Sequence, residues 1–337
     1  MIGVDVVTPS GMAGQDSADL GTPHRLVSVS VDLDAVACYY RIHALAGAPP
    51  EAARTAVLRR CLPRFAELFA RHGVRATFFV VGQDLDDDAE GRRLLAELAR
   101  NGHELASHTH THPYDFVRLG RPRIEDEIDR AHAAIGACAG TPPVGFRAPG
   151  YEIAADVIDA LEARGYRYDS SVFPSATYYG AKALVMAAMR AVGRPSGSVL
   201  GSPRALLAPR RPYRPAAGAP YQPGGTALVE LPIAVTPVAR IPIFGTSLIL
   251  APAAVRRRLV AVALRAPFFN LELHGIDLAD ADADAMPAAL IARQPDLRRP
   301  LAHKLAALDD TLAAARAAGA RFATLAEAAA SVALAPA

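Results

Sequence analysis

The chain has 337 residues, 51% of them hydrophobic, and a formal net charge of +2. This length is long for one ordinary domain but normal for an α/β barrel, and the apolar content excludes wholesale disorder. The near-neutral charge argues against nucleic acid as the main partner.

Residues 1–24 are polar and punctuated by Gly and Pro, which predicts a flexible lead-in before a folded unit over 25–337. This start does not resemble a signal peptide, and no run of ~18 apolar residues predicts a transmembrane helix. The cysteines Cys38, Cys61 and Cys138 form no CxxC pair, which favours a reducing compartment. We therefore expect a cytoplasmic protein, with peripheral contact at the inner membrane face as an option.

Short β-branched or aromatic segments alternate with amphipathic ones along the chain. The predicted strands are 26–32, 76–82, 103–108, 144–148, 166–171, 268–275 and 321–325. The predicted helices are 51–72, 88–101, 123–138, 154–164, 252–265 and 298–318, with a last helix after 325. Such alternation implies parallel strands with helical crossovers. It predicts a closed or nearly closed (β/α) barrel, with an open doubly wound sheet as the alternative.

Residues 175–225 interrupt this rhythm. An Ala-rich apolar segment, YYGAKALVMAAMRAVG (178–193), is followed by the Pro/Arg-rich run SPRALLAPRRPYRPAAGAPYQPGG (202–225). An excursion of this length inside a compact domain is usually functional or disordered. Three interpretations stay open: a solvated linker with one packing helix, a lid over the site, or a basic amphipathic surface over 178–215 that meets acidic lipid headgroups.

Asp32 and Asp34 end the first predicted strand, and His108 and His112 follow the third. Two histidines spaced i, i+4 can lie on one face of a helical turn and bind one metal ion, with a carboxylate as third ligand. Two histidines and one carboxylate leave positions open for water and substrate, which is typical of a catalytic metal site. Such a pair arises easily by chance among 10 histidines, so its placement in the fold matters more than its spacing.

Polar side chains fall at the carboxyl ends of several predicted strands: Asp32, His108, Arg147, Asp169 and His274. In α/β barrels this face carries the active site. Arg147 lies in an otherwise apolar strand and needs a partner, for which Asp32 would suit. The plainer interpretations are turn or N-cap aspartates, exposed loop histidines and a surface arginine. Of Asp169 and His274, the histidine is the better candidate because it follows an apolar strand.

These motifs resemble those of the polysaccharide deacetylases, also called NodB-homology or carbohydrate esterase family 4 enzymes. VSVDLD resembles their first motif, SHTHTHP the second, FRAPGY the third, YRYDSS the fourth and LELHGI the fifth, in the family's order over about residues 26–276. The resemblance implies a deformed, TIM-like (β/α)7 barrel that binds a divalent metal, usually zinc. The Pro/Arg-rich excursion would be an insertion in that barrel.

The resemblance also implies a role for each matched residue. It assigns Asp34, His108 and His112 as metal ligands, Asp32 as general base, Arg147 as the residue that orients Asp32, His274 as general acid, Asp169 as the group that tunes His274, and Gly150 and Tyr151 as the oxyanion and substrate contacts.

Two departures from the commonest motifs affect the substrate more than the chemistry. Leu33 separates the two aspartates, a spacing similar to a D-x-D subgroup with peptidoglycan deacetylase-like, allantoinase-like and lipid-linked aminoarabinose deformylase-like members. Ala148 and Gly150 replace a proline and an aromatic residue, which widens the expected pocket.

The expected function is removal of an N-acyl group, N-acetyl in the first instance, from an amino sugar in a glycan, nucleotide sugar or lipid-linked saccharide. One alternative is the same machinery acting on a formamide or on a cyclic amide or ureide. Another is a non-catalytic glycan-binding barrel. The oligomeric state is left open.

Overall fold

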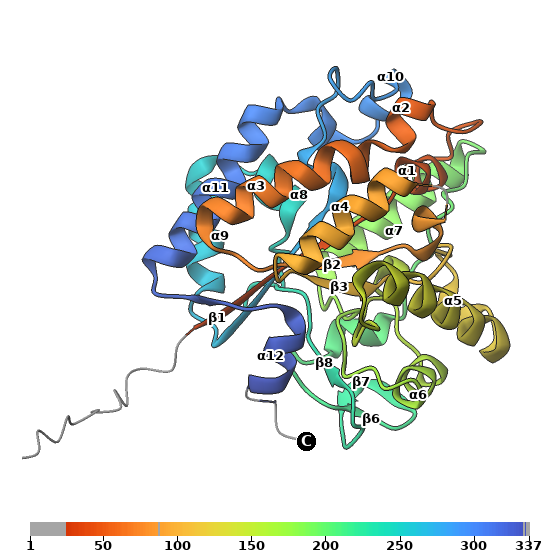
Figure 1. The fold of residues 1–337 in the computed structure, drawn as a ribbon, viewed down its shortest axis with the longest axis vertical. Helices are drawn as coiled ribbons and strands as arrows, with labels where there is room; N and C mark the ends of the chain where they lie inside the picture. The colour runs from red at the N-terminus through yellow and green to blue at the C-terminus, as the bar shows by residue number, and fades with distance from the viewer. Residues whose placement is uncertain (1–24, 87, 333, 335–337) are drawn as a thin grey trace, which may run out of the picture.

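The computed structural model describes residues 25–86, 88–332 and 334, and the predicted lead-in lies outside them. Helices surround a curled sheet (Figure 1). The strands are β1 Leu26–Asp32, β2 Thr77–Val80, β3 Glu104–Ser107, β4 Gly145–Phe146, β5 Tyr168–Asp169, β6 Pro215–Ala216, β7 Ala219–Pro223, β8 Val229–Glu230, β9 Phe268–His274 and β10 Arg321–Phe322. The α-helices are α1 Val36–Ile42, α2 Glu51–Arg54, α3 Leu62–His72, α4 Ala89–Arg100, α5 Arg121–Ala139, α6 Ala155–Ala163, α7 Ala176–Ala191, α8 Gly245–Leu250, α9 Ala253–Ala263, α10 Ala288–Ile291, α11 Leu301–Ala317 and α12 Leu325–Ser331.

The barrel is built from parallel strands around β1. Strand β9 follows one edge of β1 along its whole length, while β2 and β10 share the other edge. From β2 the order continues through β3, β4, β5 and β8. No ladder joins β8 to β9 in the described residues. Instead the Asn270 side-chain amide donates to Leu231 O at 2.9 Å, and Ala234 N donates to Asn270 O at 3.2 Å. The expected deformed (β/α)7 barrel is therefore confirmed, with an irregular seam.

Side chains alternate along β1 between an apolar face and a polar face. Val27, Val29 and Val31 are fully buried in the main hydrophobic core together with helix residues. The polar residues of β1 stand in register with polar residues of β9, in the pairs Ser28–Asn270, Ser30–Glu272 and Asp32–His274. These three pairs form a polar face on β1 and β9, and the last pair lies at the carboxyl ends of the strands.

The structure differs from the prediction at several elements. The segment 321–325 contributes only the two-residue β10 beside the start of β1, whereas the barrel strand β8 at Val229–Glu230 was not predicted. A two-residue strand carries no periodicity, which explains the omission. The single helix expected over 51–72 is divided by a π-helical segment, Val57–Cys61, and ends at Gly73 with φ 61°.

The insertion at 175–225 contains α7 and the β6–β7 hairpin. No residue of α7 is buried, and Leu184 and Val192 are 72% and 71% exposed. Among the helices of the described chain, none combines the length and apolarity that crossing a bilayer requires.

Candidate active site

A cavity of about 340 Å³ opens where the barrel strands end, and α7 forms one of its walls. Seven of the nine predicted site residues line it: Asp32, Asp34, His108, His112, Gly150, Tyr151 and His274. Arg147 lies fully buried against Asp32, and Asp169 is buried in separate contacts. The structure therefore brings together residues that are up to 242 positions apart in the chain, as Asp32 and His274 are.

One carboxylate and two imidazoles converge in this cavity. The Asp34 Oδ1 atom lies 3.3 Å from His108 Nε2 and 3.2 Å from His112 Nε2. The same oxygen is buried and has no hydrogen-bond partner in the described residues, so these approaches are not ordinary hydrogen bonds. Ligand atoms at 2.0–2.1 Å around a tetrahedral zinc ion are about 3.3 Å apart. The donor set and its spacing therefore fit a divalent cation of this size.

The orientation of His108 favours metal binding through its Nε2 atom. His108 Nδ1 lies 2.6 Å from the backbone oxygen of Arg147, which can only accept a hydrogen bond, so Nδ1 carries the proton. The Nε2 lone pair then faces Asp34. Burial opposes ionisation of Asp34, but His112 and His108 outweigh it and hold the pKa of this carboxyl well below its ordinary value. Asp34 is thus an anion at neutral pH, as a candidate metal ligand should be.

The two histidines are carried by a loop, and not by the helical turn that their i, i+4 spacing would also allow. Residues 108–112 are irregular, with the left-handed φ angles of 64° at Thr109 and 55° at His112. The Glu127 carboxylate of α5 holds the loop by accepting hydrogen bonds from the backbone N–H groups of His110 and Thr111 at 2.9 and 2.7 Å. These contacts offset the strain of the left-handed residues and fix where His112 points.

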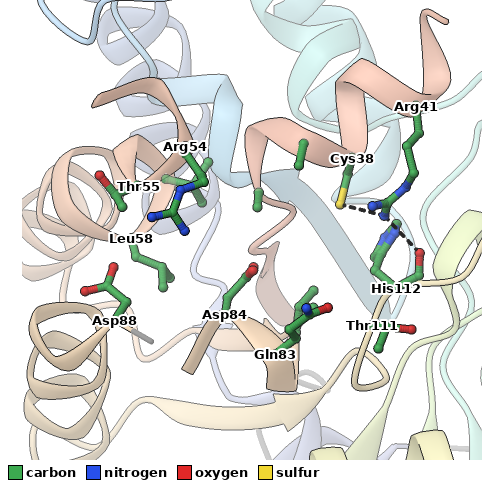
Figure 2. A pocket seen from close by; sticks show the side chains of 14 residues that line it. Cys38, Arg41, Arg54, Thr55, Leu58, Gln83, Asp84, Asp88, Thr111 and His112 are labelled. Atoms are coloured by element: carbon green, nitrogen blue, oxygen red, sulfur yellow. Dashed lines mark hydrogen bonds between the residues drawn. The ribbon is translucent and has the colours of Figure 1, made fainter. Parts of the chain in front are cut away.

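A second, smaller pocket of about 250 Å³ lies beside the His112 loop, and Figure 2 shows its lining. At one side of this pocket Arg41 of α1 donates to Cys38 Sγ at 3.3 Å and to His112 O at 3.2 Å. Burial, with a contribution from Asp34, raises the pKa of Asp84 in this pocket to about 7. The Arg41 contact is therefore a second hold on the His112 loop, besides that of Glu127.

Asp32 is held by a fully buried arginine. Arg147 Nη1 donates to Asp32 Oδ1 at 2.5 Å, and the remaining guanidinium N–H groups donate to Ser30 Oγ, Ser170 Oγ and Ser170 O at 2.8–3.0 Å. The guanidinium also stacks 4.1 Å from the centre of the Phe79 ring. Asp32 is therefore a fixed carboxylate with one oxygen committed to Arg147, beside but outside the Asp34 cluster.

His274 is paired with a carboxylate that the sequence interpretation missed. His274 Nδ1 lies 3.3 Å from Glu272 Oε1, and the Tyr151 hydroxyl donates to the same oxygen at 2.8 Å while lying 3.1 Å from His274 Nε2. Burial lowers the pKa of His274, but Glu272 and Asp32 outweigh it and raise that pKa to about 9. Glu272 stands two residues before His274 and so on the same face of β9. A charged residue inside the apolar run FFNLELH was the signal that could have revealed it.

Asp169 does not reach His274, and its predicted tuning role is corrected. Its carboxylate accepts a hydrogen bond from Ser171 Oγ at 2.6 Å and faces Glu230, whose pKa burial and Asp169 raise well above the ordinary value. Asp169 and Glu230 are neighbours across the β5–β8 ladder, and burial raises the pKa of Asp169 as well. Glu272 takes the position beside His274 that the resemblance had given to Asp169.

Gly150 and Tyr151 lie in a 3₁₀ turn, η4 Pro149–Tyr151, at the edge of the cavity. Both have left-handed φ angles, 73° and 67°. Such a conformation is ordinary for glycine and costly for tyrosine. The cost at Tyr151 is offset by the two polar contacts of its hydroxyl and by ring contacts with Phe173 and Tyr178.

Known proteins match this chain in sequence. The family model for polysaccharide deacetylases matches residues 54–168. A chitooligosaccharide deacetylase from Bradyrhizobium sp. is 38% identical over 90 residues, which is 26% of this chain and 39% of that protein. A peptidoglycan deacetylase from Helicobacter pylori is 26% identical over 148 residues, 44% of this chain and 49% of that protein. The chain thus spans at most about half the length of these curated relatives.

Solved structures share the fold over nearly the whole chain. A Mycobacterium smegmatis protein assigned to the polysaccharide deacetylases aligns with a TM-score of 0.57 at 19% identity, covering 96% of this chain and 94% of that one. A Pseudomonas aeruginosa protein with the same assignment aligns with a TM-score of 0.55 at 14% identity, covering 91% of each chain. At these identities the likeness concerns the fold alone.

Proposed function

We propose that this chain, a member of the polysaccharide deacetylase family, is a metal-dependent amide hydrolase acting on an amino sugar. The acyl group is N-acetyl, and the sugar is part of a glycan, a nucleotide sugar or a lipid-linked saccharide. One observation carries the proposal: Asp34, His108 and His112 converge at metal-ligand spacing beside the separately held carboxylate of Asp32. A cavity large enough for a sugar residue opens over these groups.

Asp34 and Asp32 have different proposed roles because they have different partners. Asp34 with His108 and His112 would hold a divalent ion, for which zinc is proposed from the mixed nitrogen and oxygen ligands. When bound, such an ion polarises the amide carbonyl and lowers the pKa of a water molecule. Asp32 has one oxygen fixed by Arg147, and its other oxygen is available to take the proton of the attacking water.

In this proposal His274 gives a proton to the leaving nitrogen. Its pKa near 9 keeps the imidazole protonated at neutral pH, as a general acid requires. Glu272 and the Tyr151 hydroxyl hold the ring in position from the barrel interior. The 3₁₀ turn at Gly150 also lines the cavity, where a backbone N–H would meet the developing oxyanion.

The pH profile tests the role of His274 through Glu272. We expect Glu272→Gln to lower the pKa of His274 from about 9 toward its ordinary 6.5, because the carboxylate that most raises it is removed. A general acid works only when protonated, so the loss of kcat with rising pH moves to lower pH in the variant. The measurement is kcat against pH from 5 to 10. Glu230→Gln, at a buried carboxyl paired with Asp169 instead, is the matched control and leaves this limb in place. An unchanged alkaline limb in Glu272→Gln would remove the proton-donor role from His274.

The proposed reaction is tested by product analysis. Zinc-loaded protein is incubated with N-acetylglucosamine oligomers, a nucleotide-linked N-acetylamino sugar and a lipid-linked saccharide, and acetate release is measured together with mass loss of the sugar. Acetate from at least one of them is the expected result. Formate release from N-formyl analogues alone, or ring opening of a cyclic ureide alone, would replace the N-acetyl proposal. A folded, fully metal-loaded protein that converts none of these compounds would contradict it.

A further inference from the structure

The chain uses lysine at only two positions, Lys182 and Lys304, although it has 36 basic residues. Lys182 is half-buried and Lys304 is fully buried, and the two ammonium groups lie in different surroundings. Lys304 is fully buried, donates to Ala279 O at 2.9 Å and lies near the carboxyls of Asp296 and Asp277. Lys182 lies on α7 and lines the active-site cavity. Lys304 therefore has structural partners, and Lys182 faces the substrate space.

Lys182 has no hydrogen bond and no ion pair with any described residue. Its ammonium group lies above the Gly150 turn, since a methyl group in place of the Gly150 hydrogen would be 3.9 Å from Lys182 Nζ. The carboxylate that acts electrostatically on Lys182 is that of Glu152, and the Glu152 side chain packs against Gly201. Burial lowers the pKa of Lys182 to about 8, so the group remains mainly protonated at neutral pH. A half-buried cation without a partner is costly unless a ligand supplies the partner.

The other charges at this cavity are already compensated within the protein. Asp32 is paired with Arg147, Asp34 with two imidazoles, and His274 with Glu272. Lys182 is the one lysine or arginine among the described residues that line the cavity. An anion that enters with the substrate would therefore find a single positive group available to it, beside the Gly150 turn.

We propose that Lys182 forms an oxyanion subsite, which selects amino sugars that carry a phosphate or carboxylate group besides the N-acyl group. The inference rests on the proposed function, because the same sugar must place its amide at Asp32 and Asp34. An ammonium group offers three donors and a compact charge, which suit phosphate or carboxylate oxygens approaching from a range of directions. Lys182 is thus a specificity-determining residue that takes no part in bond cleavage.

Binding measurements test the subsite without needing turnover. The probes are N-acetylglucosamine, N-acetylglucosamine 1-phosphate and the carboxylate-bearing N-acetylmuramic acid, titrated into zinc-loaded protein. We expect at least one anionic sugar to bind the wild type about tenfold or more tighter than the neutral sugar, as charge-assisted hydrogen bonds allow. The advantage is lost in Lys182→Gln and largely kept in Lys182→Arg. Arg190→Gln, an exposed cation on the same helix, is the matched control and keeps it.

The scarcity of lysine gives a direct spectroscopic readout. Reductive ¹³C-methylation preserves the charge of the side chain and should label only Lys182, Lys304 and the N-terminal amine. The Lys182 resonance, identified by its absence in Lys182→Gln, is expected to shift and to titrate at higher pH with the anionic sugar, while Lys304 does not respond. Whether N-acetylglucosamine 1-phosphate or N-acetylmuramic acid binds more tightly shows whether the subsite prefers phosphate or carboxylate.

Several results would overturn the subsite. Equal affinity of the wild type for neutral and anionic sugars would do so. So would an anion preference that survives in Lys182→Gln, or an equal loss of affinity for all sugars in that variant. A protein that binds the anionic sugar through Lys182 but releases no acyl group from any compound would contradict the proposed function and leave the subsite intact.

Discussion

Replacing Asp32 with asparagine is expected to lower kcat by ~10²–10⁴-fold, the usual contribution of a general base. Asparagine keeps the shape and can still accept a hydrogen bond from Arg147, but its amide cannot take a proton from water. The metal content should stay at the wild-type level, because Asp32 lies outside the Asp34 cluster. The measurement is single-turnover hydrolysis of the best substrate, with metal analysis of the same sample.

The control for this prediction is Asp86→Asn, at an exposed carboxylate that is 3.6 Å from His110 on the outer side of the loop. It removes one negative charge from the same region and should leave kcat within about twofold, as surface changes usually do. A metal-loaded Asp32→Asn protein with wild-type kcat would show that another group accepts the proton, and the assignment of Asp32 would fail.

Replacing Arg147 with methionine is expected to lower the free energy of unfolding by about 3–5 kcal/mol, as breaking a buried ion pair typically does. The reason is that Asp32, 2% exposed, would be left as a buried charge without its partner. The donors to Ser30 and Ser170 would be lost as well. Urea unfolding at pH 7 measures the change.

A double variant separates the unpaired charge from the lost packing. Arg147→Met with Asp32→Asn should recover part of the stability, because no buried charge is left uncompensated. Arg93→Met, at an exposed arginine paired with Glu90 and Glu97, is the control and should change stability by no more than ~1 kcal/mol. If the losses of stability in Arg147→Met and Asp32→Asn simply add in the double variant, the ion pair is not the source of the effect.

The barrel was predictable because its longest strands carry a simple pattern. In β1, valines alternate with Ser28, Ser30 and Asp32, and this pattern predicts a strand with one apolar face and one polar face. Most parts of the candidate site followed from the same logic, since parallel strands place their carboxyl ends at one rim. Asp34 and the two histidines could therefore be grouped from the sequence.

The remaining features depend on contacts that no local pattern encodes. The His112 loop is set by Glu127 and Arg41, which lie elsewhere in the chain, so its left-handed backbone could not be read from SHTHTHP. Whether Asp169 reaches His274 depends on which strands are neighbours: β9 adjoins β1, whereas β5 adjoins β4 and β8. The sequence left open whether the segment that contains α7 covers the site, so the position of Lys182 at the cavity could not be predicted.

The central claim is that one carboxylate and two imidazoles share a single cation at the rim of the barrel. Crystals of zinc-loaded protein, with diffraction data collected on both sides of the zinc absorption edge, test it most directly. The account predicts one anomalous peak per chain, at about 2.0–2.2 Å from Asp34 Oδ1, His108 Nε2 and His112 Nε2, and its disappearance in His108→Ala. A zinc peak bound to other residues, or none at this position in a protein that hydrolyses its substrate, would contradict it.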